Sequence, residues 1–190
     1  MRQSSLIVGI AIVTSALAAT SASAAVTVFG NTTARACYEL ALTERSGPGD
    51  INVCTEAIED RMISGRDRVA SYVNRGILYV RSGDYVRAIA DYDRAIELDG
   101  TEPEAYLNKG LALLHQRRAT ADVVSLLTTA IEHGTREPAL AYYGRGVAHE
   151  LNGDIPAAYY DIRRATDIDP EWDLPARDLS RFRVVGGQGG

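Results

Sequence analysis

The sequence predicts an all-α protein in which antiparallel helix pairs stack side by side as a solenoid. The first observation is an internal repeat, because the stretch 72–98 returns as 142–168 with the same Tyr-x-x-Arg-Gly start and Gly-Asp centre. The second is the placing of small residues. Gly76, Ala88 and Ala95 lie where paired helices must approach closely, and large residues lie between them. One such pair cannot bury its apolar face alone, so the pattern favours a stack of repeats.

The first 24 residues have the pattern of a secretory signal peptide. Arg2 is followed by an apolar run from Leu6 to Ala19, and Ala22-Ser23-Ala24 fits a small-x-small cleavage site. The run has about 14 residues, whereas an uncleaved membrane anchor, which is the alternative, needs roughly 20 to span a bilayer. We therefore expect cleavage after Ala24, a periplasmic or secreted chain, and no stable membrane insertion after the cut.

After a flexible lead-in at residues 25–32, the first predicted helix pair spans 33–44 and 51–63, separated by a turn rich in Gly and Pro. An antiparallel hairpin brings Cys37 and Cys54 to nearly the same height. An exported chain lies in an oxidising compartment, so we predict a structural disulfide, with two buried free thiols as the alternative. The spacing is not the C-x-x-C of a redox-active pair.

The rest of the chain continues the pattern of helix pairs around short turns, followed by a capping helix and a flexible Gly-rich tail. The predicted helices are 68–82 with 85–98, 104–116 with 121–133, 137–151 with 155–168, and the capping helix 171–182, before the tail 183–190. The repeat domain therefore covers 33–182, in units 33–67, 68–102, 103–138 and 139–170, with the capping helix last.

One charge pattern recurs with the repeat. Arg75 and Asp91 are 16 residues apart, as are Arg145 and Asp161, which places each pair at the same height on facing helices of a hairpin. Because charges are rarely buried unless they are paired, we predict two structural ion pairs. Lys109 has no acidic residue at the corresponding place, so its charge is expected to be freer.

The composition excludes several classes of function. A net charge of −5 in 190 residues is opposite to the clustered positive face that nucleic acid requires. The three histidines, His115, His133 and His149, lie on different predicted helices without ligand spacing, so no metal site is expected. No Ser, Cys or His lies in a nucleophile motif, and we predict neither enzymatic activity nor a cofactor.

The repeats resemble the tetratricopeptide repeat (TPR), a unit of about 34 residues. With Gly76 at the eighth position of the unit, the large and small residues of the family fall in place at Tyr72, Tyr79, Ala88, Tyr92 and Ala95. Departures are Gly100, where proline is usual, and His149, where tyrosine is usual. The resemblance covers about residues 33–182 and implies a right-handed superhelix. The chain is also similar to small exported TPR proteins of alphaproteobacteria.

The resemblance implies a concave groove lined by the first helix of each pair, which in this family holds a peptide or helix of a partner protein. The residues that carry over to this groove are Val73, Asn74, Ile77, Val80, Leu107, Asn108, Leu111, Leu114, Tyr143, Val147 and Glu150. Family members that bind a C-terminal carboxylate use cations here, and this groove lacks them. An apolar groove suits an amphipathic helix or a hydrophobic segment instead.

Three alternatives stay open for this groove. Its side chains are either available to a partner or covered by their own neighbours or by the lead-in. Asn74 and Asn108, at the same repeat position, either hold a peptide backbone or bond to an adjacent helix. The expected function is that of an exported interaction module. The alternative is a structural or self-associating envelope protein whose groove is filled by another copy.

Overall fold

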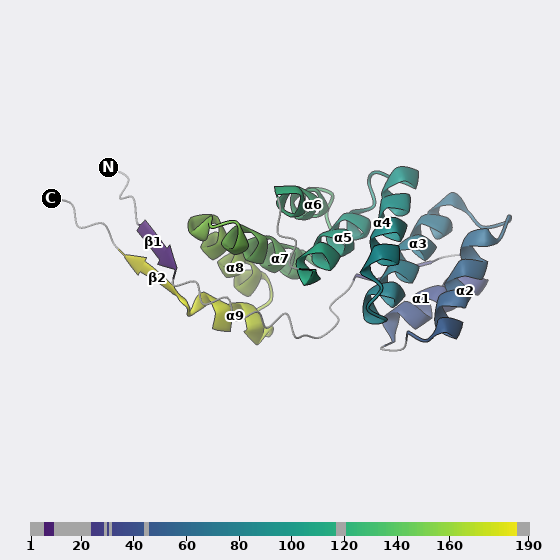
Figure 1. Ribbon diagram of the computed structural model, residues 1–190, viewed down its shortest axis with the longest axis horizontal. Coiled ribbons are helices and arrows are strands. Elements are labelled where there is room, and N and C mark those ends of the chain that lie inside the picture. The colour runs from purple at the N-terminus through teal and green to yellow at the C-terminus, as the bar shows by residue number, and fades with distance from the viewer. Residues whose placement is uncertain are drawn as a thin grey trace.

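The computed structural model describes residues 6–9, 24–28, 30, 32–43, 46–116 and 121–185, and it has the predicted all-helical stack (Figure 1). The helices are α1 (Thr32–Leu42), α2 (Pro48–Glu59), α3 (Gly65–Arg81), α4 (Tyr85–Leu98), α5 (Pro103–His115), α6 (Ala121–Glu132), α7 (Pro138–Leu151), α8 (Ile155–Ile168) and α9 (Asp173–Leu179). Consecutive helices pair as hairpins, and each hairpin packs on the next, so the molecule is elongated along the stacking direction (Figure 1).

The Gly-Asp centre of the repeat forms the turn inside a hairpin. Gly83 and Gly153 have φ values of 80° and 82°, a left-handed conformation that glycine adopts without a steric penalty. The following residues, Asp84 and Asp154, cap α4 and α8 by accepting a hydrogen bond from a backbone amide three residues later. The expected turn at residues 117–120 lies outside the described residues.

The glycines at the eighth repeat position permit the close approach of two helices. A Cβ atom on Gly76 would lie 2.4 Å from the ring of Tyr92, and one on Gly146 would lie 2.7 Å from Ile162. Gly110 has the same relationship with Leu127, at 2.9 Å. A methyl group does not fit at these distances, so the small-and-large alternation seen in the sequence corresponds to interlocked helices.

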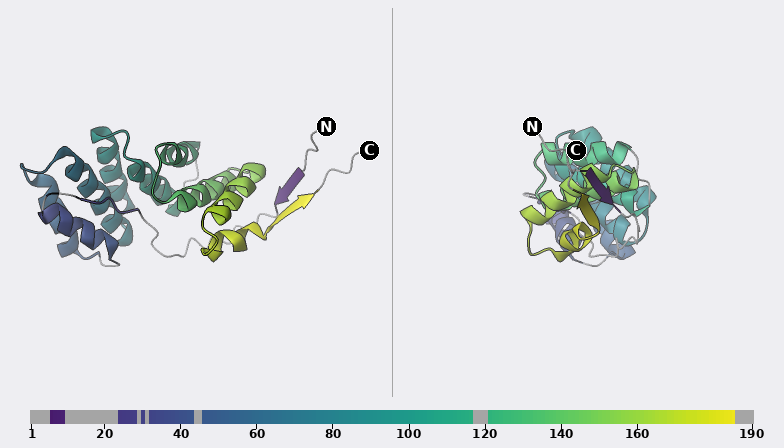
Figure 2. Two further views of the ribbon diagram at one scale, coloured as in Figure 1. Left: turned by 180° about the vertical axis from the view of Figure 1, so that it is seen from behind. Right: turned by 90° about the vertical axis from the view of Figure 1, so that its left-hand side faces the viewer.

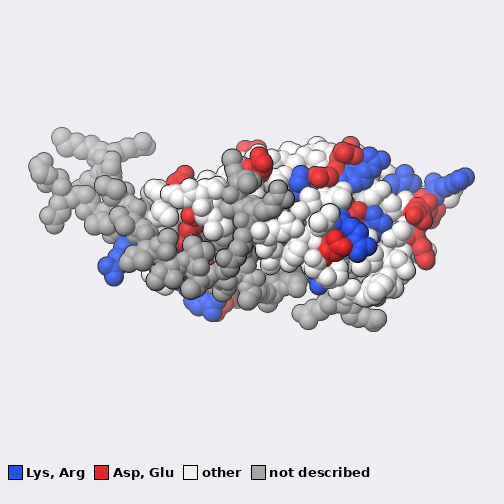
Figure 3. All heavy atoms as spheres, viewed as in Figure 1, with Lys and Arg blue, Asp and Glu red and all other residues white. Residues whose placement is uncertain are grey.

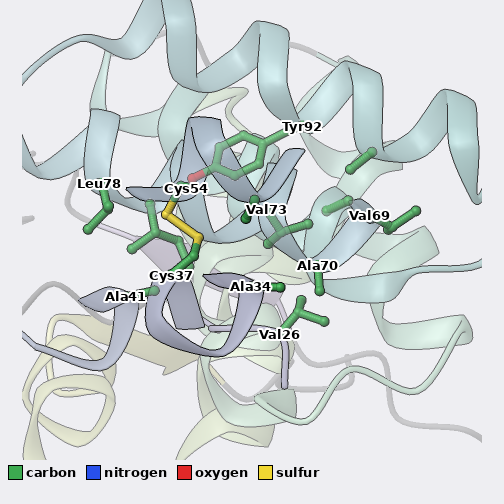
Figure 4. Packing of buried hydrophobic residues seen from close by; sticks show 14 of the residues in the cluster. Val26, Ala34, Cys37, Ala41, Cys54, Val69, Ala70, Val73, Leu78 and Tyr92 are labelled. Atoms are coloured by element: carbon green, nitrogen blue, oxygen red, sulfur yellow. A yellow bond between two sulfur atoms is a disulfide. The ribbon is translucent and has the colours of Figure 1, made fainter. Parts of the chain in front are cut away.

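The first hairpin carries the predicted covalent link. Cys37 of α1 and Cys54 of α2 are joined by a disulfide with a Cα–Cα distance of 4.7 Å, and both residues are fully buried. The disulfide belongs to the same apolar cluster as Val73 of α3 and Val26 of the N-terminal segment (Figure 4).

The two predicted ion pairs are present and extend further than expected. Arg75 donates two hydrogen bonds to Asp91, at 2.8 and 2.7 Å, and a third at 3.0 Å to Thr55 of the preceding hairpin. The last full repeat has the same arrangement, in which Arg145 bonds twice to Asp161 and once, at 3.0 Å, to Thr128 of α6. Each arginine therefore links its own hairpin to the one before it.

Lys109 corrects one expectation from the sequence. Its charge was expected to be freer because its own hairpin offers no acid, but Nζ lies 2.5 Å from Oδ1 of Asp93, on α4 of the preceding hairpin. The expectation was wrong because it considered partners within the hairpin of Lys109 alone. The faces of adjacent hairpins meet here, and they supply the acid.

At the C-terminal end, a short strand follows α9. β2 (Phe182–Val185) pairs antiparallel with β1 (Leu6–Gly9), so part of the expected tail is paired with part of the expected signal peptide. Residues 186–190 lie outside the described part. Acidic and basic side chains are interspersed on the face shown in Figure 3. None of the helices among the described residues combines the length and the apolar character needed to cross a bilayer.

Candidate functional site

The expected groove positions lie on α3, α5 and α7, which contact one another in turn, and an extended segment of the same chain packs against α3 and α5. We call residues 24–28 the resident segment; it forms neither helix nor strand and passes beside α3 (Figure 2). Burial alternates along it, because Ala24, Val26 and Val28 are buried whereas Ala25 and Thr27 are half-buried. Period-two burial is the signature of an extended chain lying on an apolar surface. Residues 25–28 of the expected flexible lead-in thus lie against α3 in the structure.

Asn74 binds the backbone of the resident segment in both directions. Its Oδ1 accepts a hydrogen bond from the amide of Val26, and its Nδ2 donates one to the carbonyl oxygen of the same residue, each at 2.9 Å. The carboxamide is fully buried. A carboxamide can do this because it carries a donor and an acceptor side by side, as a residue in a neighbouring β-strand does.

Asn108 repeats this contact one TPR unit later. The amide of Ala24 donates to Oδ1 of Asn108 at 3.3 Å, and Nδ2 of Asn108 donates to the carbonyl oxygen of Ala24 at 3.0 Å. The same Nδ2 also donates to the carbonyl of Glu104 within α5, at 2.9 Å, which orients the carboxamide. The sequence left open whether these asparagines bond to a peptide backbone or to a helix. Asn108 does both.

The side chains of the resident segment fill apolar surface between the helices. Val26 and Val28 belong to the cluster that contains Val73 and Ile77, whereas Ala24 belongs to a second cluster built around Leu107, Leu114 and Leu140. The segment therefore spans two hairpins, with its first residue on α5 and its third on α3.

Arg136 contacts the outer edge of the resident segment. This residue lies in the loop between α6 and α7, and its Nη1 donates to the carbonyl oxygen of Ala25 at 3.3 Å and to Oγ1 of Thr27 at 3.4 Å. Its backbone amide donates to Oε1 of Glu104 at 2.9 Å, which fixes the loop against α5. The sequence analysis missed Arg136, because a loop residue outside the repeat pattern gives no signal of its position in space.

Glu102 and Glu104 form a pair of carboxyl groups beside this loop. Burial, followed by the hydrogen bond with Glu104 and the charge of Glu104, raises the pKa of Glu102 to about 7. Burial opposes ionisation of Glu104 as well, but hydrogen bonds from Glu102 and from the amide of Arg136 outweigh it and lower the pKa of Glu104. Glu104 thus loses its proton at a lower pH than Glu102 does.

The far end of the groove is covered by the C-terminal capping region. The Tyr143 hydroxyl donates to Oδ2 of Asp178 at 2.7 Å, and the ring of Tyr143 packs edge-on against Trp172. Glu150 accepts two hydrogen bonds from Arg181, at 2.7 and 3.1 Å. The fourth repeat has no asparagine at the groove position, because Gly144 takes its place and Leu111 packs against it.

None of the eleven expected groove residues is exposed. Those that are buried are Val73, Asn74, Ile77, Leu107, Asn108, Leu114 and Tyr143, and those that are half-buried are Val80, Leu111, Val147 and Glu150. Within the part of the chain that the structure describes, no three His, Cys, Asp or Glu side chains are grouped as ligands for a metal ion.

Two family comparisons match the repeats. The family described as "TPR repeat" matches residues 74–116, and the family described as "Tetratricopeptide repeat" matches residues 124–171. No curated protein matches the chain.

Solved TPR structures have the same fold. MamA from Desulfovibrio magneticus superposes with a TM-score of 0.64 at 20% identity, covering 78% of this chain and 82% of that one. The second TPR domain of human RPAP3, in complex with an HSP70 peptide, gives 0.57 at 24% identity, covering 62% and 97%. YrrB, described as a TPR protein with an unusual peptide-binding site, gives 0.57 at 21% identity, covering 69% and 64%. At these identities the likeness establishes the fold alone.

Proposed function

Because this chain is a tetratricopeptide-repeat protein, we propose that it is an interaction module that binds an extended segment of a partner protein along α3 and α5. The observation that carries the proposal is the pair of buried asparagines one repeat apart, each placed to bond to both backbone groups of one residue. Backbone bonding of this kind fits an extended chain and not a helix, whose amides and carbonyls are already paired.

The comparisons support the general class. The human RPAP3 domain and the YrrB protein are both described as peptide-binding TPR structures. The ligand chemistry differs here, because the groove offers apolar surface and two carboxamides in place of a set of cations. We therefore propose a hydrophobic extended segment as the ligand, in place of the amphipathic helix that is the other expectation from the sequence.

We further propose that the chain works outside the cytoplasm. The disulfide between Cys37 and Cys54 is compatible with an oxidising compartment such as the periplasm. The leader pattern of residues 1–24 supports the same location.

The test is direct binding of a labelled nonapeptide with the sequence of residues 22–30, Ala-Ser-Ala-Ala-Val-Thr-Val-Phe-Gly, followed by fluorescence polarisation. The receptor is the open-groove variant, the full chain with residues 24–28 replaced by Gly-Ser-Gly-Ser-Gly. We expect saturable binding that weakens at least tenfold on adding Asn74→Ala and stays unchanged on adding Asn152→Ala, an exposed asparagine. A folded open-groove variant that does not bind the nonapeptide would contradict the proposed function.

Self-association is the second candidate, because residues 24–28 of one copy could occupy the groove of another with the same contacts. Light scattering on the full chain separates the two. A stable dimer that becomes a monomer in the open-groove variant would favour self-association over an adaptor for other proteins.

A further inference from the structure

We propose that the resident segment is a built-in competitor for the groove, and that cutting the chain after Ala24 weakens it so that a partner segment can enter. This inference rests on the proposed function, and it adds that the cut after Ala24 regulates binding of the partner. In the uncut chain, residues 24–28 of the same molecule occupy the groove. After the cut, an extended segment of a partner protein replaces them.

The contacts of Ala24 and Val26 explain why the position of the cut matters. Four backbone hydrogen bonds from carboxamides hold the resident segment, two at Ala24 and two at Val26. Hydrolysis of the Ala24–Ala25 amide adds water across that bond, leaving a carboxylate on Ala24 and an ammonium group on Ala25. Ala24 then departs with the leader, and the two bonds to Asn108 are lost while the two bonds to Asn74 remain.

The apolar contacts divide at the same place. Ala24 packs in the cluster of Leu107 and Leu114, whereas Val26 and Val28 pack in the cluster of the first two hairpins. The cut therefore vacates the α5 part of the groove and leaves the α3 part occupied. The new ammonium group also replaces a half-buried amide, and a charged group at this depth favours the solvent.

The resident segment also defines what a competing partner looks like. The surface over Asn108 accepts a small side chain, and the surface over Asn74 accepts a side chain of the size of valine. Arg136 offers donors to a backbone carbonyl and to a hydroxyl on the outer edge. The partner is thus an extended segment with small or β-branched aliphatic side chains at every second position, and a serine or threonine facing Arg136.

The binding experiment compares three receptors with the nonapeptide: the full uncut chain, the chain that begins at Ala25, and the full chain with Ala24→Pro. Proline removes the amide that donates to Asn108 but keeps residues 1–23, so it separates the loss of this contact from the loss of the leader. We expect the affinity to rise roughly tenfold from the uncut chain to the chain beginning at Ala25, with Ala24→Pro between them.

Hydrogen exchange of the Val26 amide supplies a readout that needs no added peptide. In the uncut chain this amide is bonded to Asn74 and should be protected, and the chain that begins at Ala25 should exchange it faster. If the uncut and cut chains bound the nonapeptide with equal affinity, residues 24–28 would not compete for the groove. The proposed peptide-binding function would still stand. If the Val26 amide of the uncut chain exchanged its hydrogen as fast as a free peptide does, that result would also contradict competition by residues 24–28.

Discussion

Val26 offers both its backbone amide and its backbone carbonyl to one side chain, the carboxamide of Asn74, and both hydrogen bonds measure 2.9 Å. The helix thereby presents the donor and acceptor that a β-strand edge would present, at a point where its own backbone groups are occupied. Asn108, 34 residues further along, makes the same contact two residues back along the segment. One repeat of the solenoid thus recognises two residues of an extended chain.

Asn74→Ala should lower the free energy of unfolding by about 1–3 kcal/mol. The substitution leaves the amide and carbonyl of Val26 without their partners in a buried position, and unpaired buried polar groups cost that much. Urea denaturation followed by circular dichroism measures the change. Asn152→Ala, at the exposed position that follows the last residue of α7, is the control and should change stability by less than about 0.5 kcal/mol. Equal effects of the two substitutions would contradict the assignment of Asn74 to the groove.

Gly76→Ala should destabilise the fold by about 1–3 kcal/mol, because the added methyl group would lie 2.4 Å from the ring of Tyr92 and the buried ring has to move. Gly65→Ala at the start of α3 is the matched control, since no atom lies within 4 Å of a Cβ at that position. Thermal denaturation of the two variants compares them directly. If Gly65→Ala were the more damaging change, the close approach of α3 and α4 would not be the reason for glycine at position 76.

Asp91→Ala should cost about 3 kcal/mol, whereas Asp93→Ala should cost less than about 1 kcal/mol. Removal of Asp91 leaves the partly buried guanidinium of Arg75 without its two strongest acceptors. Removal of Asp93 leaves Lys109, whose pair is much more open to solvent. Chemical denaturation of both variants ranks the two ion pairs, and the reverse order would show that burial does not set their contributions.

Reduction of the disulfide should lower stability by about 3 kcal/mol, the value typical of a closed loop of this length. Urea denaturation with and without a reductant measures it, and Cys37→Ser with Cys54→Ser gives the same comparison without a reducing agent. Non-reducing mass spectrometry of the purified chain checks the link itself. Two free thiols in the oxidised sample would rule the link out.

The contribution of Glu102 to the free energy of unfolding should decrease as the pH rises from about 4.5 to about 7. Burial and Glu104 raise the pKa of Glu102 to about 7 from its ordinary value of 4.5. Between these values the folded chain keeps a proton that the unfolded chain has lost, so raising the pH favours unfolding. Glu102→Gln should remove this part of the decrease, as measured by urea denaturation at pH 5 and pH 7.5.

The comparison with Glu102→Gln is needed because a second group acts in the opposite direction. Burial lowers the pKa of His115, so stability from this residue increases as the pH rises toward 6.5. The difference between the two proteins isolates Glu102. If both proteins showed the same pH dependence, the pKa of Glu102 would not be raised in the folded chain.

Much of the architecture could be predicted from local rules. Three features depend only on spacing within one repeat, and the repeat is visible in the sequence. They are the turn at Gly83 and Asp84, the glycine at position 76, and the ion pairs of Arg75 and Arg145. The partner of Lys109 could not be predicted in this way, because Asp93 belongs to the adjacent hairpin. Contacts between repeats depend on how the hairpins are rotated against one another, which no single repeat encodes.

The groove was predicted as a set of positions, but its occupant was not. The alternation of Ala24, Val26 and Val28 with less buried residues is a strand-like pattern, yet only five residues long, and a short run at the edge of a leader is weak evidence. Its docking depends on Asn74 and Asn108, which lie 48 and 84 residues away from their partners. Nothing in the sequence indicated that Arg136 would contact the resident segment.

The link between Lys109 and Asp93 joins the second hairpin to the third. Arg75 and Arg145 each reach the preceding hairpin through one hydrogen bond to a threonine, whereas an ammonium group and a half-exposed carboxylate form the ion pair at the middle boundary. The resident segment crosses this middle boundary, with Ala24 on one side and Val26 on the other. Cutting after Ala24 would therefore also remove one of the links that connect the second hairpin to the third.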